Sequence, residues 1–206
     1  MRRNIKENSF IIAQLEQTYK RRRYYLLMRF HPAVLMFACF VLLVPLSIAG
    51  PEDFNGRMGF IAEDLKGNFS LSNVELKFAD VRDGSAEAKR YPFRGYFIVL
   101  DYSELGNASD FELRGMIAHE LGHLETYSRM SWLGLGIYGM RYEFSREFRK
   151  EVERETDVIA IRHGFGEELL AFREYRLRTG SEKDRKILED FYLSLEEIKN
   201  LTIQIG

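Results

Sequence analysis

The sequence predicts an α+β domain, in which a short sheet packs against a long helix and further helices complete the fold. Residues 74–78 and 96–100 alternate in polarity and are rich in β-branched and aromatic side chains, which is typical of strands. The long helix is expected to begin near Asp110, because Ser109 and Glu112 have the spacing of a capping box. Apolar side chains then recur at helical spacing, which gives this helix a buried side.

Weaker signals describe the rest of the domain, which we place at residues 50–206. Residues 51–68 are polar and contain several glycines, and they predict a linker with a short helix at 60–65. Residues 82–85 have the composition of a turn between the two strands, and residues 91–95 predict an irregular approach to the second strand.

Two helices are expected near the C-terminus. The first covers residues 167–179 and ends at Gly180, and the second begins from a cap at Ser181. The apolar stripe of the second helix continues as far as Ile198. The tail at residues 201–205 has the composition of a strand.

A metal site is predicted from the stretch His119-Glu120-Leu121-Gly122-His123 within the long helix. Residues four apart on a helix point to the same side, so the two imidazoles can bind one zinc ion together. The carboxylate of Glu120 then projects close to the metal without binding it. This is the HExxH pattern of zinc metallopeptidases, and it predicts one Zn²⁺ per chain.

A second helix is expected to supply the third ligand, because a catalytic zinc has three protein ligands and an open position for water. Glu153 lies 30 residues after His123, in a run of helical periodicity that Gly164 is placed to end. Asp157 lies one turn beyond Glu153, on the same face. We therefore predict Glu153 as the third ligand, and Asp157 as the carboxylate that holds a ligating imidazole by its other N–H.

HExxH followed by ExxxD resembles the gluzincins. The surrounding residues resemble most the membrane-associated peptidases that include the CAAX prenyl endopeptidase and the bacterial heat-shock membrane protease. In that group the first motif is roughly E-L-x-x-[VI]-[LI]-A-H-E-x-G-H, and residues 112–123 are ELRGMIAHELGH. The second motif is usually E-x-x-A-D, and residues 153–157 are ERETD, with Thr156 in place of alanine. The resemblance covers about residues 70–166 and implies a small zincin-like domain; the chain lacks the multiple spans of the larger members.

The resemblance implies a zinc endopeptidase whose substrate is a peptide or protein. Zinc would polarise the scissile carbonyl and activate a water molecule, and Glu120 would act as the general base. Gluzincins stabilise the oxyanion with a Tyr or His from elsewhere in the fold, for which Tyr138, Tyr142 and His163 are the candidates. The resemblance also implies that substrate pairs in extended form with the strand at residues 96–100.

Residues 132–140 are apolar, rich in glycine and too short to span a bilayer. They predict a loop that lines the cleft, a patch that rests on a membrane, or a segment that simply packs against the fold. The alternative function follows from this segment: a non-catalytic, zinc-stabilised, membrane-anchored domain that binds a partner through it. Glu120 argues against this alternative, because a structural zinc site has no use for a general base.

The N-terminal part divides into a basic segment at residues 1–23 and an apolar segment at residues 24–49. From Ala33 to Ala49 there are 17 residues without a charge, the short end of the range for a spanning helix. The sequence favours a single membrane anchor; a signal peptide cleaved near Ala49, which would make the protein secreted, and a buried core helix are the alternatives. Eight Lys and Arg residues precede the apolar run, so the positive-inside rule places the catalytic domain outside the cytoplasm.

The composition excludes two other classes. The net charge is −1 and no nucleic-acid motif is present, so nucleic acid is not an expected partner. The single cysteine, Cys39, lies in the apolar run and cannot form an intramolecular disulfide.

Overall fold

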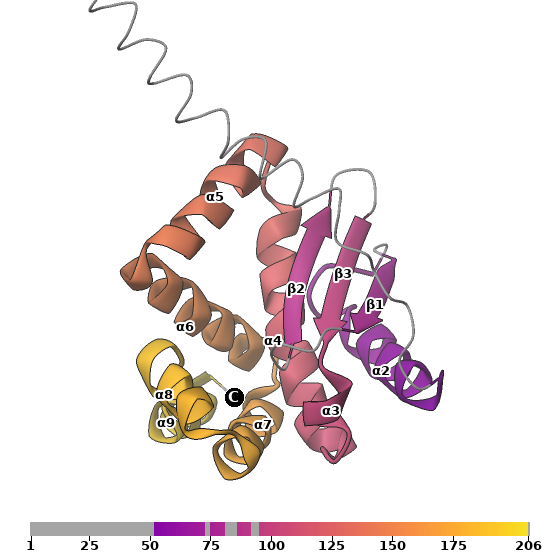
Figure 1. Ribbon diagram of the computed structural model, residues 1–206, viewed down its shortest axis with the longest axis vertical. Coiled ribbons are helices and arrows are strands. Elements are labelled where there is room, and N and C mark those ends of the chain that lie inside the picture. Colours follow the sequence, from indigo (N-terminus) through magenta and orange to yellow (C-terminus); the bar gives the residue numbers. More distant parts are fainter. Residues whose placement is uncertain (1–51, 73–74, 81–85, 92–94, 206) are drawn as a thin grey trace, which may run out of the picture. The chain divides into compact units, whose positions relative to one another are not determined.

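The computed structural model describes residues 52–72, 75–80, 86–91 and 95–205, all within one compact unit. Its elements, in chain order, are α2 (Glu52–Leu65), β1 (Leu76–Asp80), β2 (Ala86–Tyr91), β3 (Gly95–Leu100), α3 (Tyr102–Leu105), α4 (Asp110–Ser128), α5 (Trp132–Phe144), α6 (Arg146–Arg162), α7 (Gly166–Thr179), α8 (Glu182–Phe191) and α9 (Leu195–Ile205) (Figure 1). The predicted α+β class is confirmed in this form: the described chain is rich in helix and carries a small three-stranded sheet.

The predicted basic segment at residues 1–23, the predicted anchor or signal at 24–49 and the predicted turn at 82–85 all lie outside the described residues. Among the described helices, none combines the length and the apolar character needed to cross a membrane.

The sheet has the strand order β1-β3-β2. β1 and β3 are the two predicted strands and they pair in parallel, with Phe78 opposite Ile98. β2 pairs with β3 in the antiparallel sense, with Ala88 opposite Ile98. The sequence did not indicate β2, because its residues AEAKRY lack β-branched side chains and only Ala88 among them is buried. Since β3 is paired along both edges, the prediction that substrate pairs with residues 96–100 is wrong.

Helix α4 is the centre of the fold. It begins at the predicted capping box, in which the Ser109 side chain accepts the Glu112 N–H and the Glu112 carboxylate accepts the Ser109 N–H. It packs against α2, α6, α7 and β2 (Figure 1). Every residue from Gly115 to Glu125 is therefore buried, rather than those of one side alone. The crossing with α7 is close at Gly115, where a Cβ atom would lie 2.0 Å from the carbonyl oxygen of Glu168.

Three sequence predictions are wrong. Residues 51–68 are not a linker, because α2 places the fully buried side chains of Met58 and Leu65 in the core. Residues 132–140 are not a loop, because Ser131 accepts the N–H of Gly134 and starts α5 despite its glycines. The tail at 201–205 is not a strand but the end of α9.

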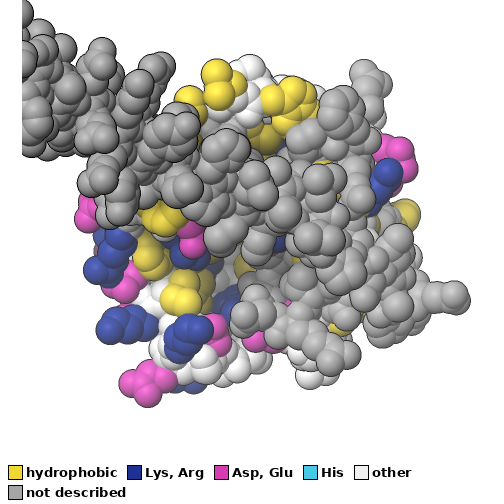
Figure 2. Space-filling model, turned by 45° about the horizontal axis from the view of Figure 1, so that its top comes forward, with side chains coloured by type: hydrophobic (Ala, Val, Ile, Leu, Met, Phe, Trp, Pro, Cys, Tyr) yellow, Lys and Arg dark blue, Asp and Glu magenta, His cyan; other side chains and the backbone are white. Residues whose placement is uncertain are grey.

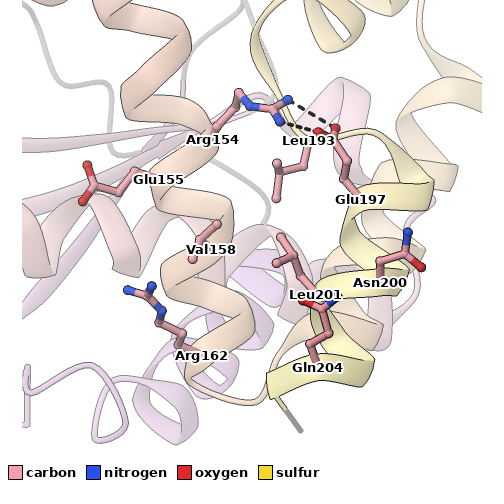
Figure 3. Close-up of a pocket in the computed structure, with 9 residues that line it drawn as sticks. All are labelled: Arg154, Glu155, Val158, Arg162, Leu193, Glu197, Asn200, Leu201 and Gln204. Carbon is pink, nitrogen blue, oxygen red and sulfur yellow. Dashed lines mark hydrogen bonds and ion pairs between the residues drawn. The ribbon is translucent and has the colours of Figure 1, made fainter.

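Helix α9 begins at a capping box that was not predicted from the sequence. The Glu197 carboxylate accepts the Ser194 N–H at 2.9 Å, and Ser194 Oγ accepts the Glu197 N–H at 3.2 Å. A hollow lies between α6 and α9, crossed by the ion pair between Arg154 and Glu197 (Figure 3). Its lining residues are Arg154, Glu155, Val158, Arg162, Leu193, Glu197, Asn200, Leu201 and Gln204, and they do not include the predicted ligands.

Candidate metal centre

The structure brings the three predicted ligands together in a buried cluster. His119 and His123 lie one turn apart on α4, and Glu153 comes from α6, which packs against α4. One ligand atom from each residue lies within 4.8 Å of the others. The exposed fractions are 6% for each histidine and 2% for the glutamate. This cluster could hold a metal ion.

The two imidazoles converge on one carboxylate oxygen. Oε2 of Glu153 lies 3.2 Å from Nε2 of His119 and 3.5 Å from Nε2 of His123. The two rings are 4.9 Å apart between centroids and nearly perpendicular, at 87°. Burial by itself raises the pKa of Glu153, but its hydrogen bonds to the two imidazoles outweigh burial and hold that pKa well below its ordinary value.

Asp157 orients His119 from the other side of the ring. Its Oδ1 lies 2.8 Å from His119 Nδ1 and accepts a hydrogen bond from Arg173, also at 2.8 Å. Its Oδ2 accepts the backbone N–H of Leu193 at 3.0 Å. A carboxylate at Nδ1 requires a proton there, and the contact of Nε2 with Glu153 requires a second one. Burial lowers the pKa of His119, but the hydrogen bonds to Asp157 and Glu153 outweigh burial and raise this pKa to about 10. A metal ion bound by His119 would take the place of the Nε2 proton. Burial by itself raises the pKa of Asp157. The Arg173 charge and the His119 hydrogen bond outweigh burial and lower the pKa below its ordinary value, so the carboxyl group stays ionised.

Thr156 has the corresponding position for His123. Its Oγ1 donates to the carbonyl oxygen of Val152 at 2.8 Å and lies 3.2 Å from Nδ1 of His123. Because the hydroxyl proton is already used, Oγ1 can only accept, and the proton of His123 must be on Nδ1. Nε2 of His123 is therefore the nitrogen that faces Glu153 and that a metal ion would bind. No sequence pattern explained the threonine at this position, where the family that the chain resembles has alanine.

Glu120 is buried beside the cluster, with an exposed fraction of 6%, and its Oε2 has no hydrogen-bond partner among the described residues. Burial raises the pKa of Glu120, the two imidazoles oppose this rise, and the negative charge of Glu153 adds to it. An unpaired buried carboxylate oxygen costs free energy and is rare in folded proteins. Its pKa responds to the charges of His119, His123 and Glu153, so it lies near them, and its free oxygen could accept a hydrogen bond from a water molecule there.

The candidates for oxyanion stabilisation separate in the structure. Tyr142 on α5 donates its hydroxyl to Oε1 of Glu153, so it is part of the cluster. Tyr138, one turn earlier, packs edge-on against Tyr127 and has a raised pKa, through burial and the charge of Glu153. His163 is directed elsewhere: its Nε2 lies 2.8 Å from Oε2 of Glu125.

Three residues near the cluster were missed by the sequence analysis. The ring of Tyr192 lies 5.6 Å from that of His119, the ring of Tyr127 lies 5.9 Å from that of His123, and Arg173 lies 4.3 Å above the Tyr192 ring. Tyr127 could have been found, because it lies four residues after His123 on the same helix face. Arg173 and Tyr192 carry no such signal, since only the folding of α7 and α8 brings them to α4.

Comparison with protein-family models, with curated proteins and with solved structures found no match for this chain.

Proposed function

We propose that this protein is a zinc-dependent endopeptidase. The single observation that carries the proposal is the arrangement around Glu153 Oε2: two imidazole nitrogens converge on it, and Glu120, with an unpaired carboxylate oxygen, is buried beside them. Two nitrogen donors, one oxygen donor and a nearby carboxylate that is not a ligand form the usual composition of a catalytic zinc site.

The donor set fits zinc better than the other common divalent ions. Calcium and magnesium take oxygen ligands almost alone, whereas neutral imidazole suits zinc and its transition-metal neighbours. Both imidazoles have an acceptor at Nδ1, Asp157 for His119 and Thr156 for His123, which leaves each Nε2 free to bind. His119, His123 and Glu153 would thus hold the ion.

The chemistry divides between the ion and the chain. Zinc at this position supplies Lewis acidity, which activates water and polarises the peptide carbonyl. Glu120 accepts the proton of the attacking water and passes it to the leaving amine; its raised pKa favours the first of these transfers, because a more basic carboxylate takes a proton more readily. Tyr142 holds Glu153 by its Oε1 and so directs Oε2 to the imidazoles. Tyr138 and Tyr192, whose pKa values burial raises, stay protonated and can donate hydrogen bonds to an oxyanion.

The substrate is proposed to bind in extended form along β2. This strand pairs with β3 on one side and packs against α4, and β3 is the only described strand with which it pairs. An extended peptide can add to such an edge through main-chain hydrogen bonds, which tolerate many side chains.

We also propose a location for the protein. It would be a single-pass membrane protein with its domain outside the cytoplasm or, after cleavage near Ala49, a secreted protein.

The test combines metal content and peptide hydrolysis in the purified full chain. We expect one zinc per chain, lost in Glu153→Ala and retained in Glu155→Ala, a control at an exposed glutamate on the same helix. Glu120→Gln should keep the zinc but lower kcat for a peptide mixture by roughly 100-fold or more. Hydrolysis at the wild-type rate in Glu120→Gln would contradict the proposal. Bound zinc in a chain that cleaves no peptide would favour the alternative, a zinc-stabilised binding domain.

A further inference from the structure

Helix α5 exposes a continuous apolar stripe. Of the nine large hydrophobic side chains that are exposed among the described residues, five belong to α5. Four of them, Leu133, Ile137, Met140 and Phe144, are spaced by four, three and four residues and so lie on one face. Their exposed fractions are 77%, 48%, 51% and 87%. Figure 2 shows one face of the molecule, on which hydrophobic side chains lie at the surface among charged ones.

The opposite side of α5 explains why the stripe is exposed. Tyr138 and Tyr142 lie about half a turn from the stripe and face the metal cluster, where Tyr142 binds Glu153. α5 packs mainly against α6, and none of its residues is fully buried. The helix therefore lies over the cluster with its tyrosines inward, and its apolar stripe has no covering element in the described part of the chain. An exposed apolar stripe of this size indicates a surface that binds a membrane or another protein.

The residues around the stripe indicate which kind of partner it binds. Helix α5 carries one cation, Arg141, and one anion, Glu143, and the nearby Arg129 and Arg146 pair with Glu125 and Asp190. Arg141, exposed at the edge of the stripe, has no ion pair among the described residues and lies over the ring of Phe148. Trp132 begins the helix and is 48% exposed. An apolar face with an exposed arginine at its edge and a tryptophan at one end is typical of helices that lie in the interface of a membrane.

We propose that the stripe of α5 (Leu133, Ile137, Met140 and Phe144) inserts into the surface of a lipid bilayer. The uncharged run at residues 33–49 is a separate indication, from the sequence, that the chain meets a membrane. Binding of lipid here would hold the helix that carries Tyr138 and Tyr142. The proposal does not depend on catalysis.

The chain contains its own reporter, because Trp132 is its only tryptophan. The full chain is reconstituted in vesicles of 70% phosphatidylcholine and 30% phosphatidylglycerol, with and without bromine on the acyl chains of the phosphatidylcholine. We expect the brominated lipid to quench the fluorescence of Trp132, and we expect the emission maximum to shift to a shorter wavelength in the presence of vesicles. Leu133→Glu and Phe144→Glu should each abolish most of the quenching, since a charge on the stripe opposes insertion. Phe144 lies three turns from Trp132, so its effect is not a local effect on the fluorophore.

Two matched controls make the result specific. Ile203→Glu places the same charge at an 80% exposed isoleucine on α9 and should leave the quenching unchanged. Glu120→Gln should also leave it unchanged, so failure of this proposal is distinguishable from failure of the proposed peptidase activity. If acrylamide quenches the fluorescence of Trp132 and brominated lipid does not, the proposal is overturned. Trp132 that is shielded from both quenchers would overturn it too, since a protein segment would then cover the stripe.

Discussion

Oγ1 of Thr156 lies 3.2 Å from Nδ1 of His123 and donates its own proton to the carbonyl oxygen of Val152. This pairing makes the hydroxyl an acceptor for His123, as the Asp157 carboxylate is an acceptor for His119. The two imidazoles thus both have an acceptor at Nδ1, a neutral one for His123 and a charged one for His119. The difference allows the two contributions to be tested separately.

Replacement of the Thr156 hydroxyl should weaken metal binding without unfolding the protein. In Thr156→Val the shape is kept and the acceptor for His123 is lost, so we expect zinc affinity to fall roughly 10- to 100-fold. The measurement is competition with a chelator of known affinity. Thr156→Ser restores the hydroxyl and should restore most of the affinity. Equal affinity in the valine variant would mean that the hydroxyl does not position His123.

Loss of Arg173 should be costly, because it leaves the Asp157 carboxylate buried without its cation. Both side chains are nearly inaccessible, at 5% and 0%. Removal of one partner of a buried ion pair typically costs about 3–5 kcal/mol, and we expect Arg173→Met to lower the free energy of unfolding by roughly that amount. Denaturant unfolding of the metal-free chain is the measurement. Arg178→Met is the control on the same helix: its side chain is 64% exposed, so a change within about 1 kcal/mol is expected.

Two glycines of α4 should respond differently to alanine. A Cβ at Gly115 would lie 2.0 Å from the backbone carbonyl oxygen of Glu168, which can move only if α7 moves, so Gly115→Ala should cost about 3 kcal/mol or prevent folding. A Cβ at Gly122 would lie 3.1 Å from the Thr156 methyl group, a smaller overlap, and should cost about 1 kcal/mol. Gly136→Ala on α5 meets no atom within 4 Å and should stabilise by up to about 1 kcal/mol. Thermal unfolding of the three variants gives the order.

The sequence predicted the centre of the fold better than its edges. The α4 helix and the cluster on its face follow from local rules, a capping box and a spacing of four residues. β2 was missed, because its six residues form a strand only through their pairing with β3. The sequence did not predict that α8 ends and α9 begins near Ser194, because Ser194 and Glu197 lie within an apolar stripe that looks continuous as far as Ile198. Arg173 reaches Asp157 through tertiary packing alone, which no local pattern records.

Removal of metal should destabilise the protein, because three converging ligands are held together in the core. An ion at 1,000 times its dissociation constant adds about 4 kcal/mol to the free energy of unfolding. For a chain of this size each kcal/mol shifts Tm by about 2–4 °C. Excess chelator should therefore lower Tm by roughly 8–16 °C. In Glu153→Ala the shift should be much smaller; an equal shift in both would show that the metal is bound elsewhere.

The ion pair between Arg154 and Glu197 joins α6 to α9 beside the hollow of Figure 3. The Arg154 hydrogen bond, with a second from the Ser194 N–H, lowers the pKa of Glu197 from its ordinary 4.5 to about 2. In Arg154→Met we expect this pKa to rise towards 4.5 but stay below it, because the Ser194 hydrogen bond remains. Titration followed by NMR of the Glu197 carboxyl carbon is the measurement.

The same pair predicts how stability depends on pH. A group whose pKa is lower in the folded chain stabilises the fold above its unfolded pKa, and this contribution disappears as the pH falls through the folded pKa. The stabilising contribution of Glu197 is therefore complete above about pH 4.5 and is lost by about pH 2. Because the two side chains are 32% and 44% exposed, solvent weakens the pair, and Arg154→Met should cost only about 1 kcal/mol at pH 7. At pH 2 the variant and the wild type should differ less; an equal difference at both pH values would mean that Arg154 acts through its hydrogen bond to the Tyr192 carbonyl rather than through Glu197.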